Sequence, residues 1–483
     1  MTATFVCDAN QRGRIFPHYW EHTVGSDHAV MALREDWRRQ IRRAHDELGF
    51  SHVRFHGLLD DDMSILTGEG EWEVYSFFNV DSIFDFLLSI GMRPFVELGF
   101  MPTPLASGDK TVFHYRGNVT APKDIGKWTL LIEKLLRHFV ERYGIDEVRH
   151  WFFEVWNEPD LKWFGGGSQA EYFEFYVVTA RAVKSVDRSL RVGGPATSAN
   201  AWIADFVAYC RRTGAPVDFI TTHHYPTDAF GRPGDDTVTQ LSLSPRSVLR
   251  DQAAKAKQEA GGLPLYYTEW CTSSNSRDGL HDEPYASSFI VKTLMEATGL
   301  VDGYSYWTFS DIFEENYFPS MPFHGGFGLL TIHDIAKPAY RAFQLMRGLG
   351  AELLKVKGAH ATVDCWIVRN ENELAIVATN FVAPRHLIAT ERLRVELKGV
   401  RSPIDAKLTR IDADHANPKA LWLEMGSPEY PTRDQIAALR RRSELTPMPI
   451  ECESTRDGLI LALDMPPYGV AVASLCFAPD ANA

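Results

Sequence analysis

Several signatures of other protein classes are missing from this sequence of 483 residues. The six cysteines are far apart and form no CxxC pair, so neither a zinc site nor a disulfide framework is indicated. No apolar run approaches the ~18 residues that a membrane-spanning helix needs. The N-terminus also lacks a basic region followed by an apolar stretch, the pattern of a secretory signal. We therefore expect a cytoplasmic protein that does not contact a membrane.

Positive charge is in deficit as well. Lys and Arg total 50 against 63 Asp and Glu, which gives a formal net charge of -13. Nucleic acids and anionic membranes bind to basic surfaces, so neither is an expected partner. Aromatic residues, in contrast, make up 12% of the chain, which is typical both of a large core and of a protein that binds the apolar faces of sugar rings.

The first part of the chain alternates short β-branched and aromatic runs with longer segments of helical period, as repeated βα units do. The eight predicted strands lie at residues 15–20, 51–57, 92–99, 149–157, 191–197, 218–225, 264–270 and 303–309. Eight parallel strands close a barrel. The predicted fold class is therefore α/β, with a (β/α)8 TIM barrel over residues 1–345.

The clearest predicted helix covers residues 124–143. Its apolar residues recur at steps of three and four, Asp124 stands at the N-cap position, and Gly144 follows the last turn. The other predicted helices lie near residues 36–48, 80–90, 169–186, 201–213, 247–260, 285–299 and 337–348. One apolar face on each helix would pack against the sheet.

A different pattern begins near residue 350. Short alternating strands at 363–368, 374–380, 390–397 and 467–476 predict a C-terminal β-sandwich, interrupted by one helix near 432–442. We assign residues 346–483 to this second domain, with the first 12 or so residues of the chain as a candidate extra strand. The Pro- and Gly-rich loops at 226–234 and 316–328 fall inside the barrel and are interpreted as active-site loops.

Polar side chains stand at the ends of most predicted barrel strands, against the apolar bias of a strand. The C-terminal strand ends of a (β/α)8 barrel converge on one face, so these side chains predict a common site. They are His56, Asn157, Glu158, His223, His224, Tyr225, Glu269 and Trp307, the last followed by Asp311, Glu314 and Glu315.

Glu158 and Glu269 could provide the two carboxyl groups that glycoside hydrolysis needs, one protonated to assist the leaving oxygen and one ionised to attack. The ends of the fourth and seventh strands can face each other across one barrel mouth. The acid needs a raised pKa, which burial beside aromatic side chains would provide. Trp156, Trp163 and Trp270 are candidates for that apolar surrounding.

Five segments carry a resemblance to known enzymes. EVWNEPD (154–160) and YTEW (267–270) resemble the acid/base and nucleophile motifs of the retaining glycosidases whose glutamates stand on strands 4 and 7. HVRFHGLLDDDM (52–63), GNVTAPKD (117–124) and WTFSDIFEE (307–315) are similar to glycoside hydrolase family 39, the family of β-xylosidases and α-L-iduronidases. The resemblance runs across the barrel and continues into the sandwich.

This resemblance implies a double displacement with net retention, in which Glu269 is the nucleophile and Glu158 the general acid/base. Asn157 would bind the 2-hydroxyl of the sugar, and Tyr225 would lie near the nucleophile. The resemblance also assigns to the sugar subsite the residues His56, His223, Tyr225, Trp307, Glu314 and Glu315. Taken alone, His56 and Trp307 could instead be core residues, and Glu314 and Glu315 part of a solvated loop.

The predicted function is that of an exo-acting β-xylosidase that releases xylose from xylooligosaccharides. An α-L-iduronidase is one alternative, but its substrate carboxylate calls for Arg or Lys in the pocket, and none stands at the strand ends named above. Another β-glycosidase and a non-catalytic sugar-binding barrel are further alternatives. Neighbouring strand residues such as His223 and His224 point to opposite faces, so no metal is predicted, and no cofactor. The sequence does not indicate an oligomeric state.

Overall fold

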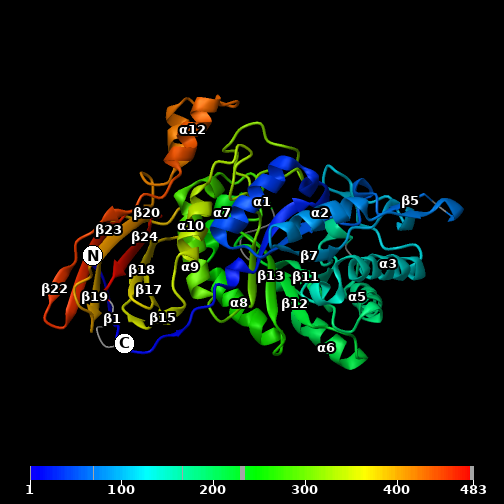
Figure 1. Cartoon of the computed structure of the whole chain (residues 1–483), viewed down its shortest axis with the longest axis horizontal. Coiled ribbons are helices and arrows are strands. Elements are labelled where there is room, and N and C mark those ends of the chain that lie inside the picture. The colour runs from blue at the N-terminus through cyan, green and yellow to red at the C-terminus, as the bar shows by residue number, and fades with distance from the viewer. Residues whose placement is uncertain (1, 69, 166, 229–233, 479–483) are drawn as a thin grey trace.

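The computed structural model describes residues 2–68, 70–165, 167–228 and 234–478. It consists of a closed barrel surrounded by helices and, beside it, two facing sheets (Figure 1). The predicted fold class, a TIM barrel followed by a β-sandwich, is thus confirmed. Within the described ranges, no helix is both long and apolar enough to cross a membrane.

Eight parallel strands close the barrel, in the order β10-β11-β12-β13-β14-β3-β4-β7. They are β3 (Thr23–His28), β4 (His52–His56), β7 (Arg93–Leu98), β10 (Phe152–Val155), β11 (Arg191–Thr197), β12 (Phe219–His223), β13 (Leu265–Trp270) and β14 (Gly303–Tyr306). In chain order β10 is the fourth strand and β13 the seventh. Seven of the eight strands coincide with predicted ones.

The prediction of the first strand at 15–20 was wrong. That run contains Pro17, which cannot donate to a strand ladder, and its first residue belongs instead to β2 (Arg14–Ile15), which pairs with the sandwich. The actual first strand, β3, has the sequence TVGSDH and all six of its residues are buried. Its Gly and polar residues hide the usual pattern of a strand.

Helices cover the outside of the barrel. They are α1 (Glu35–Leu48), α2 (Phe78–Ser89), α3 (Ile125–Tyr143), α4 (Ile145–Val148), α5 (Gln169–Val186), α6 (Ile203–Thr213), α7 (Thr237–Leu243), α8 (Val248–Glu259), α9 (Pro284–Glu296) and α10 (Pro338–Arg347). The predicted ends of α3 are confirmed: the Asp124 carboxylate accepts hydrogen bonds from the N–H groups of Gly126 and Lys127 at 2.8 and 3.1 Å, and Gly144 follows the helix with a φ of 81°.

The sandwich contains a five-stranded sheet, β16-β1-β19-β23-β22, and a seven-stranded sheet, β2-β15-β17-β18-β24-β20-β21. Its remaining strands are β1 (Thr2–Asp8), β15 (Glu352–Leu354), β16 (Val356–Lys357), β17 (Val363–Asn370), β18 (Glu373–Asn380), β19 (Glu391–Lys398), β20 (Asp405–Ile411), β21 (Met448–Pro449), β22 (Glu453–Thr455), β23 (Gly458–Met465) and β24 (Val470–Cys476). The N-terminal strand β1 runs parallel to β19 along its whole length. The division into domains at residue 345 stays a prediction.

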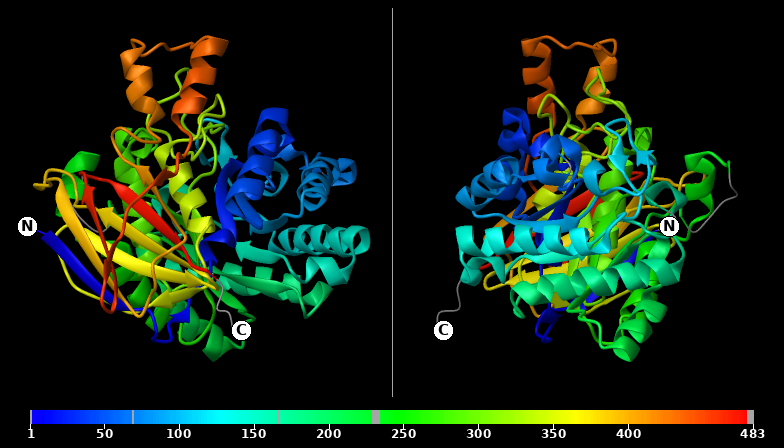
Figure 2. Two further views of the ribbon diagram at one scale, coloured as in Figure 1. Left: turned by 60° about the vertical axis from the view of Figure 1, so that its left-hand side comes forward. Right: turned by 90° about the vertical axis from the view of Figure 1, so that its right-hand side faces the viewer.

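Two further helices, α11 (Pro418–Glu424) and α12 (Arg433–Arg442), project together from the sandwich (Figure 2). The second coincides with the helix predicted near 432–442, whereas the first was not predicted. Trp422 of α11 packs on Phe323 with ring centroids 5.6 Å apart, so this pair of helices contacts the loop that follows β14. Elsewhere, the ring centroids of Tyr285 in α9 and Phe381 lie 5.3 Å apart. This contact joins the barrel to the sandwich.

Short two-residue strands form two small ribbons on the loops of the barrel. They are β5 (Leu66–Thr67) with β6 (Val74–Tyr75), and β8 (Thr111–Val112) with β9 (Gly117–Asn118). Of the loop predicted at 226–234, residues 229–233 lie outside the described residues.

Candidate active site

The loops after the barrel strands surround a cavity of about 700 Å³. Seven of the nine predicted site residues line it, and all seven are buried. They are His56, Asn157, Glu158, Tyr225, Glu269, Trp307 and Glu315. Exposed residues line it too, among them Trp163, Ala199, Ser274 and Asn316. The cavity therefore has a buried floor and an open rim.

The other two predicted residues lie nearby but do not line this cavity. His223 is fully buried behind the two glutamates. Glu314 turns to the side, with its carboxylate oxygens 3.3 Å from His28 and 3.6 Å from His114. The backbone N–H of Glu314 also donates to the Asp27 carboxylate at 2.8 Å, which fixes this turn of the chain.

Glu269 ends strand β13 and is held from both sides. One carboxylate oxygen accepts a hydrogen bond from Arg54 at 2.8 Å, and the other accepts one from the Tyr225 hydroxyl at 2.8 Å. Burial by itself would raise the pKa of Glu269, but the charges of His223, Arg54 and His56 and the hydrogen bond from Tyr225 outweigh it. The net pKa is lowered, so this carboxyl group is kept ionised.

Glu158 follows strand β10 in a left-handed backbone conformation, with φ 41°. Such a conformation costs a side-chain-bearing residue about 1–3 kcal/mol, and here the N–H of Glu158 is held by the Ala196 carbonyl at 2.8 Å. Burial raises the pKa of Glu158 to about 7; the adjacent His223 lowers this pKa and the charge of Glu269 adds to the rise. Glu158 is therefore protonated over a much wider pH range than Glu269.

The two carboxyl groups lie close together. One oxygen of Glu158 and one of Glu269 are within 4.8 Å of each other. Carboxyl groups of retaining glycosidases are about 5–5.5 Å apart, and those of inverting enzymes about 6.5–9.5 Å. The spacing fits direct attack by one carboxylate better than a water held between the two.

Asn157 presents a free donor beside these carboxyl groups. Its side-chain oxygen accepts a hydrogen bond from Arg54 at 2.8 Å, which fixes the orientation of the amide. Its side-chain nitrogen is buried and has no partner among the described residues. A buried N–H without an acceptor is costly, so a hydroxyl group of a ligand would be a favourable partner.

Arg54 is the main residue that sequence reasoning missed. Its guanidinium donates to Glu154 at 2.5 Å and to Glu269 at 2.8 Å, and lies 3.0 Å from Glu97. The sequence does contain a signal for it, because Arg54 precedes His56 by two residues and alternate strand residues share a face. A basic side chain thus lies directly beneath the site, contrary to the expectation from the strand ends, but three carboxylates already neutralise it.

His56, Trp307 and Glu315 form part of the buried floor of the cavity. His56 lies 2.7 Å from Glu97, 3.7 Å from Glu315, and 4.9 Å from the Trp307 ring between centroids. Glu315 is 8% exposed, which excludes a solvated loop. Burial, followed by the charges of surrounding carboxylates, raises the pKa of Glu315 well above its usual value, so it can donate a hydrogen bond.

The three tryptophans predicted to surround the acid differ in position. Trp156 is 6% exposed and lines an adjacent cavity, whereas Trp270 is fully buried and stacks on Tyr304 with centroids 4.4 Å apart. Trp163 is 74% exposed. Trp163 nevertheless lines the same cavity as Glu158, so its part in the apolar surroundings of the acid stays a prediction.

Two groups of side chains bring possible metal ligands together. The ligand atoms of Glu158, His223 and Glu269 lie within 4.8 Å of one another, and so do those of Asp27, His28 and Glu314. In each group a histidine lies between two carboxylates and pairs with both. These pairs explain why the ligand atoms are close together without a cation. That the protein uses no metal or cofactor stays a prediction.

A closed (β/α)8 barrel with buried glutamates at the ends of its fourth and seventh strands, one with a raised pKa and one with a lowered pKa, defines a glycoside hydrolase. The family model of glycosyl hydrolases family 39 matches residues 4–451. The chain belongs to glycoside hydrolase family 39.

Relatives of known name support this assignment. The chain is 51% identical, over 88% of both sequences, to a β-xylosidase of Caldicellulosiruptor saccharolyticus. It is 38% identical to a β-xylosidase of Geobacillus stearothermophilus, over 88% of this chain and 86% of that one. The crystal structure of a monomeric β-xylosidase from Caulobacter crescentus CB15 superimposes with a TM-score of 0.87 at 34% identity, covering 98% of this chain and 99% of that one.

Proposed function

We propose that this enzyme is a retaining, exo-acting β-xylosidase that releases xylose from the non-reducing ends of xylooligosaccharides. The observation that carries the proposal is the opposite ionisation of two close carboxyl groups in one cavity: the pKa of Glu158 is raised to about 7 and that of Glu269 is lowered. The names of the two β-xylosidases from Caldicellulosiruptor saccharolyticus and Geobacillus stearothermophilus support the choice of xylose.

The reaction proceeds in two displacements. Glu269 attacks the anomeric carbon while Glu158 gives its proton to the leaving oxygen, which forms a covalent glycosyl-enzyme and frees the aglycone. Glu158, now a carboxylate, takes a proton from water, and that water attacks the anomeric carbon, releases xylose and restores Glu269. Arg54 and Tyr225 keep the nucleophile ionised and oriented throughout.

The floor of the cavity fits one terminal sugar. The unpartnered side-chain N–H of Asn157 can donate to the 2-hydroxyl, next to the anomeric carbon. His56, Trp307 and Glu315 would surround the remaining ring atoms. We base exo action on this floor of buried side chains, which would receive the end of a sugar chain.

An α-L-iduronidase is the second candidate within the family, and the charge of the site disfavours it. Of the described residues that line the cavity, none is Lys or Arg. The Arg54 guanidinium below is engaged by Glu97, Glu154 and Glu269. A substrate carboxylate in this cavity would therefore find no Lys or Arg among the described lining residues with which to pair.

Two experiments test this proposal. A screen of aryl glycosides that includes the β-xyloside, α-L-arabinoside, β-glucoside and α-L-iduronide should give the highest kcat/KM on the β-xyloside. Proton NMR of early products should detect the β-anomer of xylose first. Initial appearance of the α-anomer would contradict retention, and calorimetric binding of xylobiose without turnover would indicate a sugar-binding barrel.

We also place the enzyme in the cytoplasm. The six cysteines are all free thiols in the structure, which suits a reducing compartment. Cell fractionation with an antibody against the chain tests this location.

A further inference from the structure

A large aromatic side chain is exposed at the rim of the cavity. Trp163 is 74% exposed, yet it lines the same cavity as Glu158 and Glu269. Single exposed apolar side chains are common on protein surfaces, so exposure alone assigns no role to Trp163. Its place in the cavity that holds both glutamates is what sets Trp163 apart from the equally exposed Trp72.

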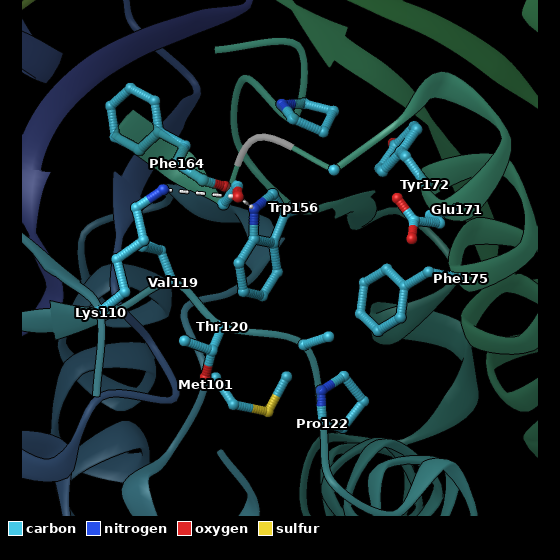
Figure 3. A pocket seen from close by; sticks show the side chains of 14 residues that line it. Met101, Lys110, Val119, Thr120, Pro122, Trp156, Phe164, Glu171, Tyr172 and Phe175 are labelled. Carbon is cyan, nitrogen blue, oxygen red and sulfur yellow. Dashed lines mark hydrogen bonds between the residues drawn. The ribbon is translucent and has the colours of Figure 1, made fainter. Parts of the chain in front are cut away.

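The loop that carries Trp163 is held in place by hydrogen bonds on its far side. A second, mainly apolar cavity of about 390 Å³ lies there (Figure 3). In this cavity the Trp156 indole N–H donates to the Phe164 carbonyl at 2.9 Å, and the Lys110 ammonium donates to the carbonyls of Lys162 and Gly165. The carbonyls on either side of Trp163 are thus fixed.

The neighbouring side chain, Phe164, is buried between the two cavities and anchors the loop. The ring of Phe164 is 8% exposed and stacks on Phe100 with centroids 5.9 Å apart. It also meets Phe113 edge to face at 5.6 Å. An anchored Phe164 next to an exposed Trp163 means that the indole is presented from a rigid backbone, at little entropic cost to a ligand.

The position of Glu158 indicates whether Trp163 would contact the terminal sugar or the leaving group. Glu158 gives its proton to the leaving oxygen, so the aglycone must begin beside that carboxyl group. Trp163 follows Glu158 by five residues in the same loop. Ser198, which also lines the rim, is tied to this loop because its N–H and hydroxyl donate to Asp160 at 2.9 and 2.5 Å.

We propose that Trp163 is the stacking platform of an aglycone subsite, on which the ring of the leaving group lies. The ligand class is a pyranose ring, such as the second xylosyl residue of an oligosaccharide, or an aromatic ring. Flat faces of both ring types offer apolar surface to an indole, and the exposed Trp163 face would be covered only while substrate is bound. This inference rests on the proposed function and extends it to the leaving group.

The test compares a substrate that has an aglycone ring with one that lacks it. For Trp163→Ala, kcat/KM on xylobiose should fall about tenfold, mainly through KM, whereas kcat/KM on methyl β-xyloside should change less than about twofold. Trp163→Phe keeps a flat ring and should restore most of the loss. Trp72→Ala is the matched control, because Trp72 is 76% exposed and does not line the cavity.

Equal losses on both substrates, or no loss on either, would overturn the subsite. Failure of the proposed function is separate, because it appears in the wild-type enzyme as absence of β-xyloside cleavage. In that case kcat/KM is compared between the disaccharide and the methyl glycoside of whichever sugar the wild type accepts. If the wild type turns over no glycoside, calorimetric binding of the same pair decides, and an unchanged preference in Trp163→Ala overturns the inference.

Discussion

The imidazole of His223 contacts both carboxyl groups of the site, with its Nδ1 3.0 Å from Oε1 of Glu158 and 3.7 Å from Oε2 of Glu269. Its Nε2 lies 3.1 Å from the Thr268 hydroxyl, which donates to Glu154. Burial alone would lower the pKa of His223, but the two glutamates outweigh burial and raise it. A protonated His223 is thus a shared countercharge that lowers both carboxyl pKa values.

The first prediction concerns the pH dependence of kcat/KM. The active form needs Glu158 protonated and Glu269 ionised. Activity should therefore fall as pH rises through about 7, where Glu158 loses its proton, and should fall again in acid, below the usual carboxyl range, where Glu269 gains one. Initial rates at low substrate concentration over pH 3–9 measure this profile. A basic limb that lies far above pH 8 contradicts the assignment of the acid.

Replacing His223 with Gln should move both limbs of this profile to higher pH, by about one unit. Gln retains a hydrogen bond but removes the positive charge that lowers the pKa of Glu158 and of Glu269. His138→Gln, on a half-buried histidine paired with Asp81 outside the cavity, is the control and should leave the profile unchanged. If either limb of the kcat/KM profile moves to lower pH in His223→Gln, His223 is not the positive charge that lowers the two carboxyl pKa values.

The two glutamates should respond differently to removal. In Glu158→Ala, kcat/KM should fall by a factor of about 10²–10⁴ on substrates with poor leaving groups. Substrates whose leaving groups need no proton should still form the glycosyl-enzyme in this variant. Azide should restore its turnover by attacking the glycosyl-enzyme. Glu269→Ala should lose nearly all activity on every substrate because no covalent intermediate can form. Rates with a series of aryl β-xylosides whose leaving groups differ in pKa measure the difference between the two variants. If both variants respond in the same way to the leaving group, the roles are wrongly assigned.

Elements with strong local chemistry could be predicted from the sequence. The ends of α3 follow from Asp124 and Gly144, whose backbone preferences do not depend on distant contacts. Seven barrel strands were found because short β-branched and aromatic runs alternate with segments of helical period along the chain. Strand β3 escaped because Asp27 and His28 at its end belong to a polar cluster, and a strand that presents polar groups to a site loses its usual pattern.

Site residues that stand at the ends of strands could be predicted from the sequence. Contacts that join side chains from several strands could not. Glu158 and Glu269 converge because barrel topology requires it. The partners of Arg54 come from β7, β10 and β13, and no local pattern couples those strands. The exposure of Trp163 depends on the path of one loop, which turns Phe164 inward and Trp163 outward.

The last prediction concerns the stability that Arg54 provides. In Arg54→Met, three buried carboxyl groups lose their common cation, and such a loss typically costs about 3–5 kcal/mol. The loss should lower the midpoint of urea unfolding, followed by tryptophan fluorescence. Arg149→Met is the control, because Arg149 forms an exposed pair with Asp146, and its effect should stay below about 1 kcal/mol.

The pH dependence of this loss distinguishes lost charge from lost packing. Without Arg54, the pKa of Glu269 rises because one of the charges that lower it is gone. Carboxyl groups with raised pKa values take up protons in the folded state as pH falls, and this uptake relieves the unpaired charge. The difference in unfolding free energy between wild type and Arg54→Met should therefore shrink between pH 7 and pH 5. A difference that stays constant over this range would assign the effect to packing of the side chain, and Arg54 would then not be the electrostatic support of the nucleophile.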